Sequence, residues 1–211
     1  MLQYILTHQA EFMVLLRQHV ILTCSAIGLA TSIGIPLAIL ASRIPFLERP
    51  VLLLGNLGQT IPSLVILALC IPFLGIGFAP SLAALFLRAI LPILMNTFTG
   101  IKNVEHGIIE AARGMGMTEN QILWKVQIPL TVPVMIAGLR TAVVQAVSLA
   151  TLAAFAGGGS LGDLIQQGIM MVDQERLMTG AVSTAALALL ADFIIGLLQQ
   201  WLTPQGLKIS A

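Results

Sequence analysis

The sequence predicts an all-α membrane protein with about five transmembrane helices, and three observations lead to this fold class. Of the 211 residues, 57% are hydrophobic and only 9% are charged, whereas soluble chains carry about 25% charged residues. The apolar residues form long runs, and a helix needs about 20 such residues to cross the hydrocarbon core. A dense cluster of charged side chains falls about halfway along the chain, between Glu105 and Pro129, which predicts a loop held in water.

Residues 1–18 are predicted to form an amphipathic segment at the membrane interface. Arg17 is their one Lys or Arg, and no small-residue cleavage site precedes the first apolar run, so a signal peptide is not indicated. The apolar residues of this segment fit one face of a helix that lies in the interface. They are Leu2, Ile5, Leu6, Phe12, Leu15 and Leu16.

One transmembrane domain is predicted at residues 19–203, followed by a cytoplasmic tail at 204–211. Its spans are expected at about 20–41, 51–73, 81–100, 130–156 and 179–201. Two further stretches, 102–129 and 157–174, are expected not to span the membrane. Cys24 and Cys70 both fall within apolar spans, so they are interpreted as small core residues rather than as a disulfide.

Polar residues in the second predicted span are candidates for a solute pathway. Gln59, Thr60 and Ser63 are unusually polar for a helix face in contact with lipid. We therefore expect this face to contact protein or a water-filled path.

Four more polar residues lie within predicted spans, and each is a candidate for the pathway or for helix packing. They are Arg88, Asn96, Arg140 and Asp192. Arg140 and Asp192 lie at similar depths from the inner ends of their spans, so we predict that they pair or share one polar cluster. Arg88 lies nearer the outer side and has no evident partner in the sequence.

The polar segment 102–129 is predicted to contain two short helices with a turn between them. Asn103 is expected to cap the first helix, over Val104–Arg113, and Gly114 and Gly116 to end it. Thr118 with Gln121 three residues later is a capping-box pattern for the second helix, which Pro129 is expected to stop. Met115 and Met117 of the turn are flexible apolar side chains suited to a groove on a partner.

The same segment resembles the EAA signature of bacterial ABC-importer permeases. The resemblance rests on Glu110-Ala111-Ala112, on Gly116 six residues after the glutamate, and on Val126-Gln127-Ile128-Pro129. Val126 and Ile128 are conservative departures from the Ile-x-Leu-Pro element that ends the signature. The resemblance implies the type I ABC importer permease fold, with 102–129 as a coupling loop whose cytoplasmic coupling helix docks on an ATP-hydrolysing subunit. The alternative is an ordinary amphipathic cytosolic loop.

A second resemblance concerns the glycine-rich stretch Gly157–Leu164, with Gly157, Gly159, Gly162 and Asp163 as its candidate residues. These glycines spell G-x-G-x-x-G, but a dinucleotide site needs a preceding strand, and here a membrane span precedes it. The stretch is instead similar to the extracellular segment of permeases for quaternary-amine osmoprotectants. Residues 59–63 and 91–101 are similar to the same permeases, from which Arg88 and Met95 depart.

The loop charges predict an orientation with the N-terminus outside and the C-terminus in the cytoplasm. Arg17 and Arg176 then lie outside. The residues placed inside are Arg43, Arg49, Lys102, Arg113, Lys125 and Lys208.

The resemblance implies a permease subunit of an ATP-driven importer in the bacterial cytoplasmic (inner) membrane. Its substrates would be quaternary amines such as glycine betaine, choline or carnitine. Its implied partners are a pair of ATP-binding subunits, a substrate-binding protein outside and the membrane lipid. A second permease subunit, identical or related, is also expected, because five helices can hardly enclose a solute path and shield it from lipid.

No catalytic constellation or Walker A pattern is present in the sequence, so the chain is not predicted to be an enzyme, and ATP and Mg are expected on the partner ATPase. His8, His19 and His106 are scattered without metal-ligand spacing, so no metal site is predicted. The net charge of +1 and the lack of a basic tract give no indication of nucleic-acid binding. Two alternatives stay open: an importer of the same architecture for another solute such as methionine, and an ATPase-independent carrier or channel.

Overall fold

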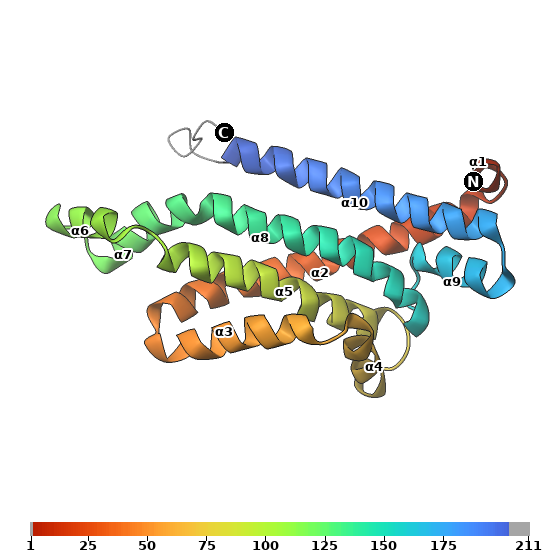
Figure 1. The fold of residues 1–211 in the computed structure, drawn as a ribbon, viewed down its shortest axis with the longest axis horizontal. Coiled ribbons are helices and arrows are strands. Elements are labelled where there is room, and N and C mark those ends of the chain that lie inside the picture. Colours follow the sequence, from red (N-terminus) through yellow and green to blue (C-terminus); the bar gives the residue numbers. More distant parts are fainter. Residues whose placement is uncertain (1, 203–211) are drawn as a thin grey trace.

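The computed structural model describes residues 2–202, without the side chains of residues 2, 3, 56 and 57. Long helices lie side by side in one bundle (Figure 1). The elements in chain order are α1 (Leu2–Thr7), α2 (Gln9–Arg43), α3 (Pro45–Thr60), α4 (Ser63–Leu74), α5 (Phe78–Lys102), α6 (His106–Gly114), α7 (Glu119–Ile122), the π-helical η1 (Leu123–Gln127), α8 (Ile128–Leu149), the 3-10 helix η2 (Ala150–Ala156), α9 (Gly162–Met171) and α10 (Gln174–Leu202). The predicted tail at 204–211, with Lys208, lies outside the described residues.

Four helical segments within residues 2–202 are long and apolar enough to cross a membrane. They are α2, α5, α10 and the continuous segment Glu119–Ala156, which joins α7, η1, α8 and η2. A fifth candidate arises only if α3 and α4 count as one span, because these helices are bent by 100° relative to each other. The predicted span at 51–73 is therefore divided by this bend, and it counts as one span only in a broken form.

The break between α3 and α4 follows from local chemistry. Ile61 and Pro62 have ψ angles of 125° and 134°, which are extended values. A residue before proline is disfavoured in the helical region, and proline has no N–H to continue the helix. Chain direction therefore changes at this dipeptide, directly beside the polar residues Gln59, Thr60 and Ser63.

The predicted N-terminal segment 1–18 is shared between two helices, α1 and the start of α2. Helix α2 begins at Gln9, so it includes half of the segment 1–18 and continues into the first span without interruption. Tyr4 forms a cluster with the buried Leu161 and Leu164, and the partly buried residues that pack on this cluster are Phe12, Leu15 and Leu16. These side chains are covered by the protein because the apolar side of α9 lies against them.

The core of the bundle lies where α2, α5 and α8 meet. Its buried residues are mostly small, and they form clusters around Ala26, Ala30, Ala89 and Ala142. A side chain on Gly138 of α8 would collide with Asn96 and with the carbonyl of Pro92 on α5. Such small residues let helix backbones approach closely in a membrane.

The helix expected to stop at Pro129 instead continues through it. Five residues of π-helix precede the proline, and the Ile128 N–H donates to the carbonyl of Leu123. Pro129 lies in the first turn of α8, where its missing N–H and fixed φ are tolerated. The second predicted helix of the coupling loop and the fourth span are thus one continuous helical segment.

Candidate coupling element and intramembrane polar groups

The coupling element, α6 and α7 with the turn between them, lies at one end of the bundle, together with the α2–α3 connection (Figure 1). The Thr118 side chain accepts a hydrogen bond from the Gln121 N–H, and the Gln121 side chain accepts one from the Thr118 N–H. The predicted capping box is confirmed. Gly116 has a φ of +81°, a value that L-residues with side chains rarely adopt, so the predicted turn at this glycine is confirmed as well.

The start of the first coupling helix was predicted wrongly. Helix α6 begins at His106 with Glu105 as its N-cap, and it includes Gly114 as its last residue. Asn103 is instead the C-cap of α5, where its N–H donates to the carbonyl of Thr99. Asparagine suits either end of a helix, because it favours N-caps and tolerates the conformations found at C-caps.

The residues of the EAA-like motif differ in exposure. Ala112 is buried against the chain itself, while Glu110, Ala111 and Met115 are exposed, Met115 to 75%. Met117 is half-buried, and its N–H donates to the carbonyl of Ala112. The outward side of α6 and its turn therefore presents an acidic group, a small residue and a flexible apolar side chain together.

Polar contacts hold the coupling element together and join it to α2. The guanidinium of Arg113 lies 2.8 Å from the Glu119 carboxylate, and it lowers the pKa of Glu119 below its usual range. This pair is present at neutral pH and is lost only as the pH falls through that lowered pKa. Arg43, at the end of α2, donates to the backbone carbonyl of Glu119 and to the Asn120 side chain.

Arg88 on α5 binds the α3–α4 break. Its Nη1 donates to the carbonyls of Gly58, Gln59 and Ile61 at 3.1, 3.2 and 3.4 Å. These are C-terminal carbonyls of α3, which have no partner within the helix and lie at the negative end of its dipole. The expectation that Arg88 has no partner in this chain is therefore wrong. Its partner is backbone rather than a carboxylate, which residue types alone could not indicate.

Arg140 on α8 and Asp192 on α10 form the predicted pair. The guanidinium binds the carboxylate through two parallel hydrogen bonds, Nε to Oδ1 at 2.5 Å and Nη2 to Oδ2 at 2.6 Å. The side chains are 42% and 35% exposed, so the pair lies at the surface of the single chain. It opens on a groove of about 400 Å³.

The remaining polar candidates of the spans lie in different surroundings. The Asn96 side chain donates to the carbonyl of Pro92 at 2.8 Å on its own helix and lies beside Gly138. Gln59 and Thr60 are exposed in the single chain, and Ser63 is half-buried. These residues are therefore not gathered with Arg140 and Asp192 into one site.

The glycine-rich stretch lies at the opposite end of the bundle from the coupling element, where η2 turns into α9 (Figure 1). Gly157 and Gly159 have positive φ angles, and a side chain on Gly162 would collide with the carbonyl oxygen of Thr151. Asp163 accepts a hydrogen bond from the Ser160 N–H at 3.0 Å. The stretch is a tight, ordered turn with no strand before it.

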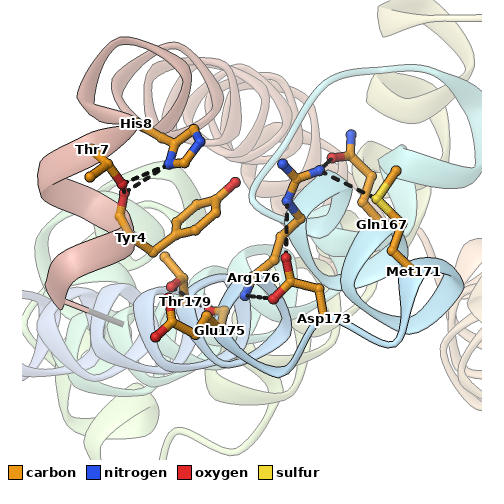
Figure 2. Close-up of polar contacts among 9 residues, drawn as sticks. All are labelled: Tyr4, Thr7, His8, Gln167, Met171, Asp173, Glu175, Arg176 and Thr179. Atoms are coloured by element: carbon orange, nitrogen blue, oxygen red, sulfur yellow. Dashed lines mark hydrogen bonds and ion pairs between the residues drawn. The ribbon is translucent and has the colours of Figure 1, made fainter.

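A cluster of side chains that the sequence did not indicate joins α1 to α9 and α10 at this end (Figure 2). The Arg176 guanidinium lies 5.6 Å from the Tyr4 ring centre and donates to the Gln167 side chain at 2.6 Å. His8 stacks on the same ring with a centre-to-centre distance of 4.4 Å. Burial raises the pKa of the Tyr4 phenol above its usual value. These contacts hold the first helix against the α9–α10 turn.

Residues 30–205 match the family of "binding-protein-dependent transport system inner membrane component" proteins. The chain belongs to this family. As an inner membrane component of such transport systems, the chain crosses the membrane with the apolar helices described above.

Three relatives illustrate the similarity within the family. The carnitine transport permease protein OpuCB of Listeria monocytogenes is 41% identical over 191 residues, which cover 90% of this chain and 88% of the relative. The glycine betaine/carnitine/choline transport system permease protein OpuCB of Bacillus subtilis is 37% identical, and the match covers 99% of this chain and 96% of the relative. The osmoprotectant import permease protein OsmW of Salmonella typhimurium is 40% identical, and the match covers 98% of this chain and 99% of the relative.

Solved structures share the fold of this inner membrane component. A chain of the MetNI methionine ABC transporter in an inward-facing conformation has a TM-score of 0.82 and is 23% identical, with 92% of this chain and 98% of that chain covered. At this identity the similarity shows the fold alone, which is that of a type I ABC importer permease.

Cysteines in this family member are free, and they are less buried than expected. Cys24 is exposed and Cys70 is half-buried, so the interpretation as core residues is wrong for Cys24. Both lie on helix surfaces that the single chain leaves uncovered. Within the described part of the chain, no group of three His, Cys, Asp or Glu side chains is placed to hold a metal ion.

Proposed function

We propose that this chain is the permease subunit of an ATP-driven, binding-protein-dependent importer of quaternary-amine osmoprotectants such as glycine betaine, choline or carnitine. The observation that carries the proposal is the combination of the exposed EAA-like element with relatives of 36–41% identity, all of them named as osmoprotectant, carnitine or choline permeases. The likeness to a methionine transporter is one of fold and does not favour methionine as the substrate.

ATP hydrolysis belongs in this proposal to a partner ATPase, which also carries ATP and Mg. Its docking site on this chain is the outward side of α6 and the following turn, with Glu110, Ala111, Met115 and Gly116. Met115 is exposed and has a flexible apolar side chain, which suits it to fill a groove on the ATPase. Ala112 supports this surface from beneath.

The orientation in the proposal has the coupling element in the cytoplasm and α1 and α9 outside. Basic residues support it, because Arg43, Arg49, Lys102, Arg113 and Lys125 lie in the segments near the coupling end, and positive charges favour the cytoplasmic side. The substrate-binding protein would then dock at the end that carries Gly157–Asp163.

A second permease subunit completes the pathway in this proposal. Large apolar side chains are exposed along α2, α3, α4 and α10, so these helices have surface that a second subunit or lipid can cover. The chain is 37% identical to OpuCB and 38% identical to OpuCD of Bacillus subtilis, two permeases that share the name of one transport system. A pair of related subunits is therefore as well supported as a pair of identical ones.

Transport would proceed by alternating access. Closure of the ATPase pair moves the coupling element, in which the Arg113–Glu119 pair joins α6 to α7. Arg43 transmits the movement to α2 through its bonds to Glu119 and Asn120. Because α7 continues into α8, the fourth span moves with the coupling element as one body. The inward and outward arrangements are the two states between which nucleotide and solute shift the population.

Reconstitution tests the proposal. The chain, its ATPase and its binding protein in vesicles should import radiolabelled glycine betaine only with ATP inside, and the chain alone should import none. Uptake by the chain alone would support a carrier or channel instead, and ATP-driven uptake of methionine but not of any quaternary amine would refute the substrate.

A matched pair of variants tests the docking site. Glu110→Lys should weaken co-purification with the ATPase, while Glu175→Lys makes the same charge change in α10 at the opposite end and should leave it unchanged. Equal ATPase recovery for both variants would exclude Glu110 from the contact.

A further inference from the structure

We propose that the Arg140–Asp192 pair is a transient binding site for a zwitterion. On binding, Arg140 and Asp192 separate from each other, and each pairs with the opposite charge of the solute. This inference rests on the proposed function and names the form of the substrate that the pathway accepts. The carboxylate of the solute would bind Arg140, and its quaternary ammonium group would lie against Asp192.

The position of the pair indicates that it does not contact lipid. Asp192 lies about ten residues before the end of α10, or about 15 Å along the helix axis, which is near the middle of a hydrocarbon core of about 30 Å. Both side chains are more than one third exposed in the single chain. Charged groups at this depth face a protein interior or a water-filled cavity, so this surface of α8 and α10 adjoins one of the two.

The groove beside the pair has the chemistry of a binding site. Its volume of about 400 Å³ lies in the range of small-molecule pockets. It combines the two charges with the Phe193 ring, which is 62% exposed, and with Gln199 and Gln200. An aromatic face attracts a quaternary ammonium ion, which has no N–H to donate. The guanidinium fork already binds a carboxylate through two hydrogen bonds, and a solute carboxylate has the same geometry.

Charge balance makes the site selective. When glycine betaine enters, each charge of the protein exchanges one opposite charge for another, so no charge is left unpaired. A cation without a carboxylate, such as choline, would occupy Asp192 and leave Arg140 unpaired, which is costly inside a membrane. The site therefore favours zwitterions over cations of similar size. The solute competes with an ion pair that is already formed, so it binds weakly enough to be released.

The test measures the accessibility of a cysteine in the groove of the assembled importer. Leu189 lines the groove and is 71% exposed, so Leu189→Cys is combined with Cys24→Ser and Cys70→Ser. Reaction with N-ethylmaleimide, a neutral reagent, is timed with glycine betaine, with choline or with neither. Met171→Cys, at the outer end and 65% exposed, is the matched control for effects of solute on labelling in general.

Glycine betaine should slow labelling at position 189 and not at position 171, and choline should have the smaller effect. The double variant Arg140→Gln/Asp192→Asn avoids an unpaired charge, so it should assemble normally. It should raise the glycine betaine concentration needed for protection by about tenfold or more, as expected for the loss of one charge-assisted hydrogen bond.

Three outcomes would overturn the inference: equal protection in the double variant, equal protection by choline, or a cysteine at position 189 that does not react because protein or lipid covers it. The proposed function is judged separately, by ATP-dependent uptake into the same vesicles. Uptake without protection would reject the zwitterion site and leave the importer function intact.

Discussion

Replacing Arg88 by methionine should loosen the break between α3 and α4 without unfolding the bundle. The perturbation removes the Nη1 donor that serves the carbonyls of Gly58, Gln59 and Ile61. One nitrogen carries two hydrogens, so the loss corresponds to about two hydrogen bonds from a charged group, or about 3–6 kcal/mol. The substitution also removes a charge from the membrane, and this stabilises the protein by about 2.5–3.5 kcal/mol, the cost of placing that charge there. The net destabilisation is therefore about 0–3 kcal/mol, and it is local to the connection between α3 and α4.

Hydrogen exchange measured by mass spectrometry on the protein in micelles detects this change. The N–H groups of Val65 and Ile66 donate to the Pro62 carbonyl at the start of α4. A cost near 1.4 kcal/mol would make them exchange about tenfold faster, since local opening follows its free energy. Leu87→Met is the matched control, because it makes a substitution of similar size one residue away without removing a donor. Equal exchange around Pro62 in Arg88→Met and Leu87→Met would refute the role assigned to Arg88.

Three further changes have expected outcomes. Gly116→Ala places a side chain at φ +81° and should cost about 1–2 kcal/mol locally, seen as reduced recovery of the ATPase in co-purification. Asp163→Asn weakens the bond to the Ser160 N–H and should lower the free energy of unfolding by about 1 kcal/mol, measured by thermal denaturation. Tyr4→Phe should be nearly neutral, because the buried hydroxyl makes no hydrogen bond, whereas Tyr4→Ala removes the ring beside Arg176 and should lower the unfolding temperature clearly.

Local patterns were predicted well, because their causes lie within a few residues of one another. The capping box at Thr118 needs only the residue three positions later, and the turn at Gly116 needs only a glycine. Arg140 and Asp192 are distant in sequence, yet their pairing could be predicted because both residues are expected at the same depth in the membrane. Charges in a membrane need partners, and few partners were available at that depth.

Other features could not be predicted because their causes are not local. The contact of Tyr4 with α9 and α10 joins residues more than 150 positions apart, and no periodicity in residues 1–18 distinguishes a protein surface from a lipid surface. Arg88 binds backbone carbonyls, which every residue carries. The break at Ile61-Pro62 did have a signal, since proline disfavours helix at the preceding residue, but the length of the apolar run at 51–73 predicted only that it forms one span.

The unbroken helical segment from Glu119 to Ala156 has a mechanical consequence. If this segment moved as one body about the close contact of Gly138 with α5, it would act as a lever. The arm from Gly138 to Ala156 is about 30 Å long, at about 1.5 Å per residue in α8 and about 2.0 Å per residue in the 3-10 helix η2. A tilt of about 5° then displaces the Ala156 tip by about 2.6 Å, in the direction opposite to the Glu119 tip. Movement of the coupling element at one end of the bundle would thus be accompanied by an opposite movement of the glycine-rich turn at the other end.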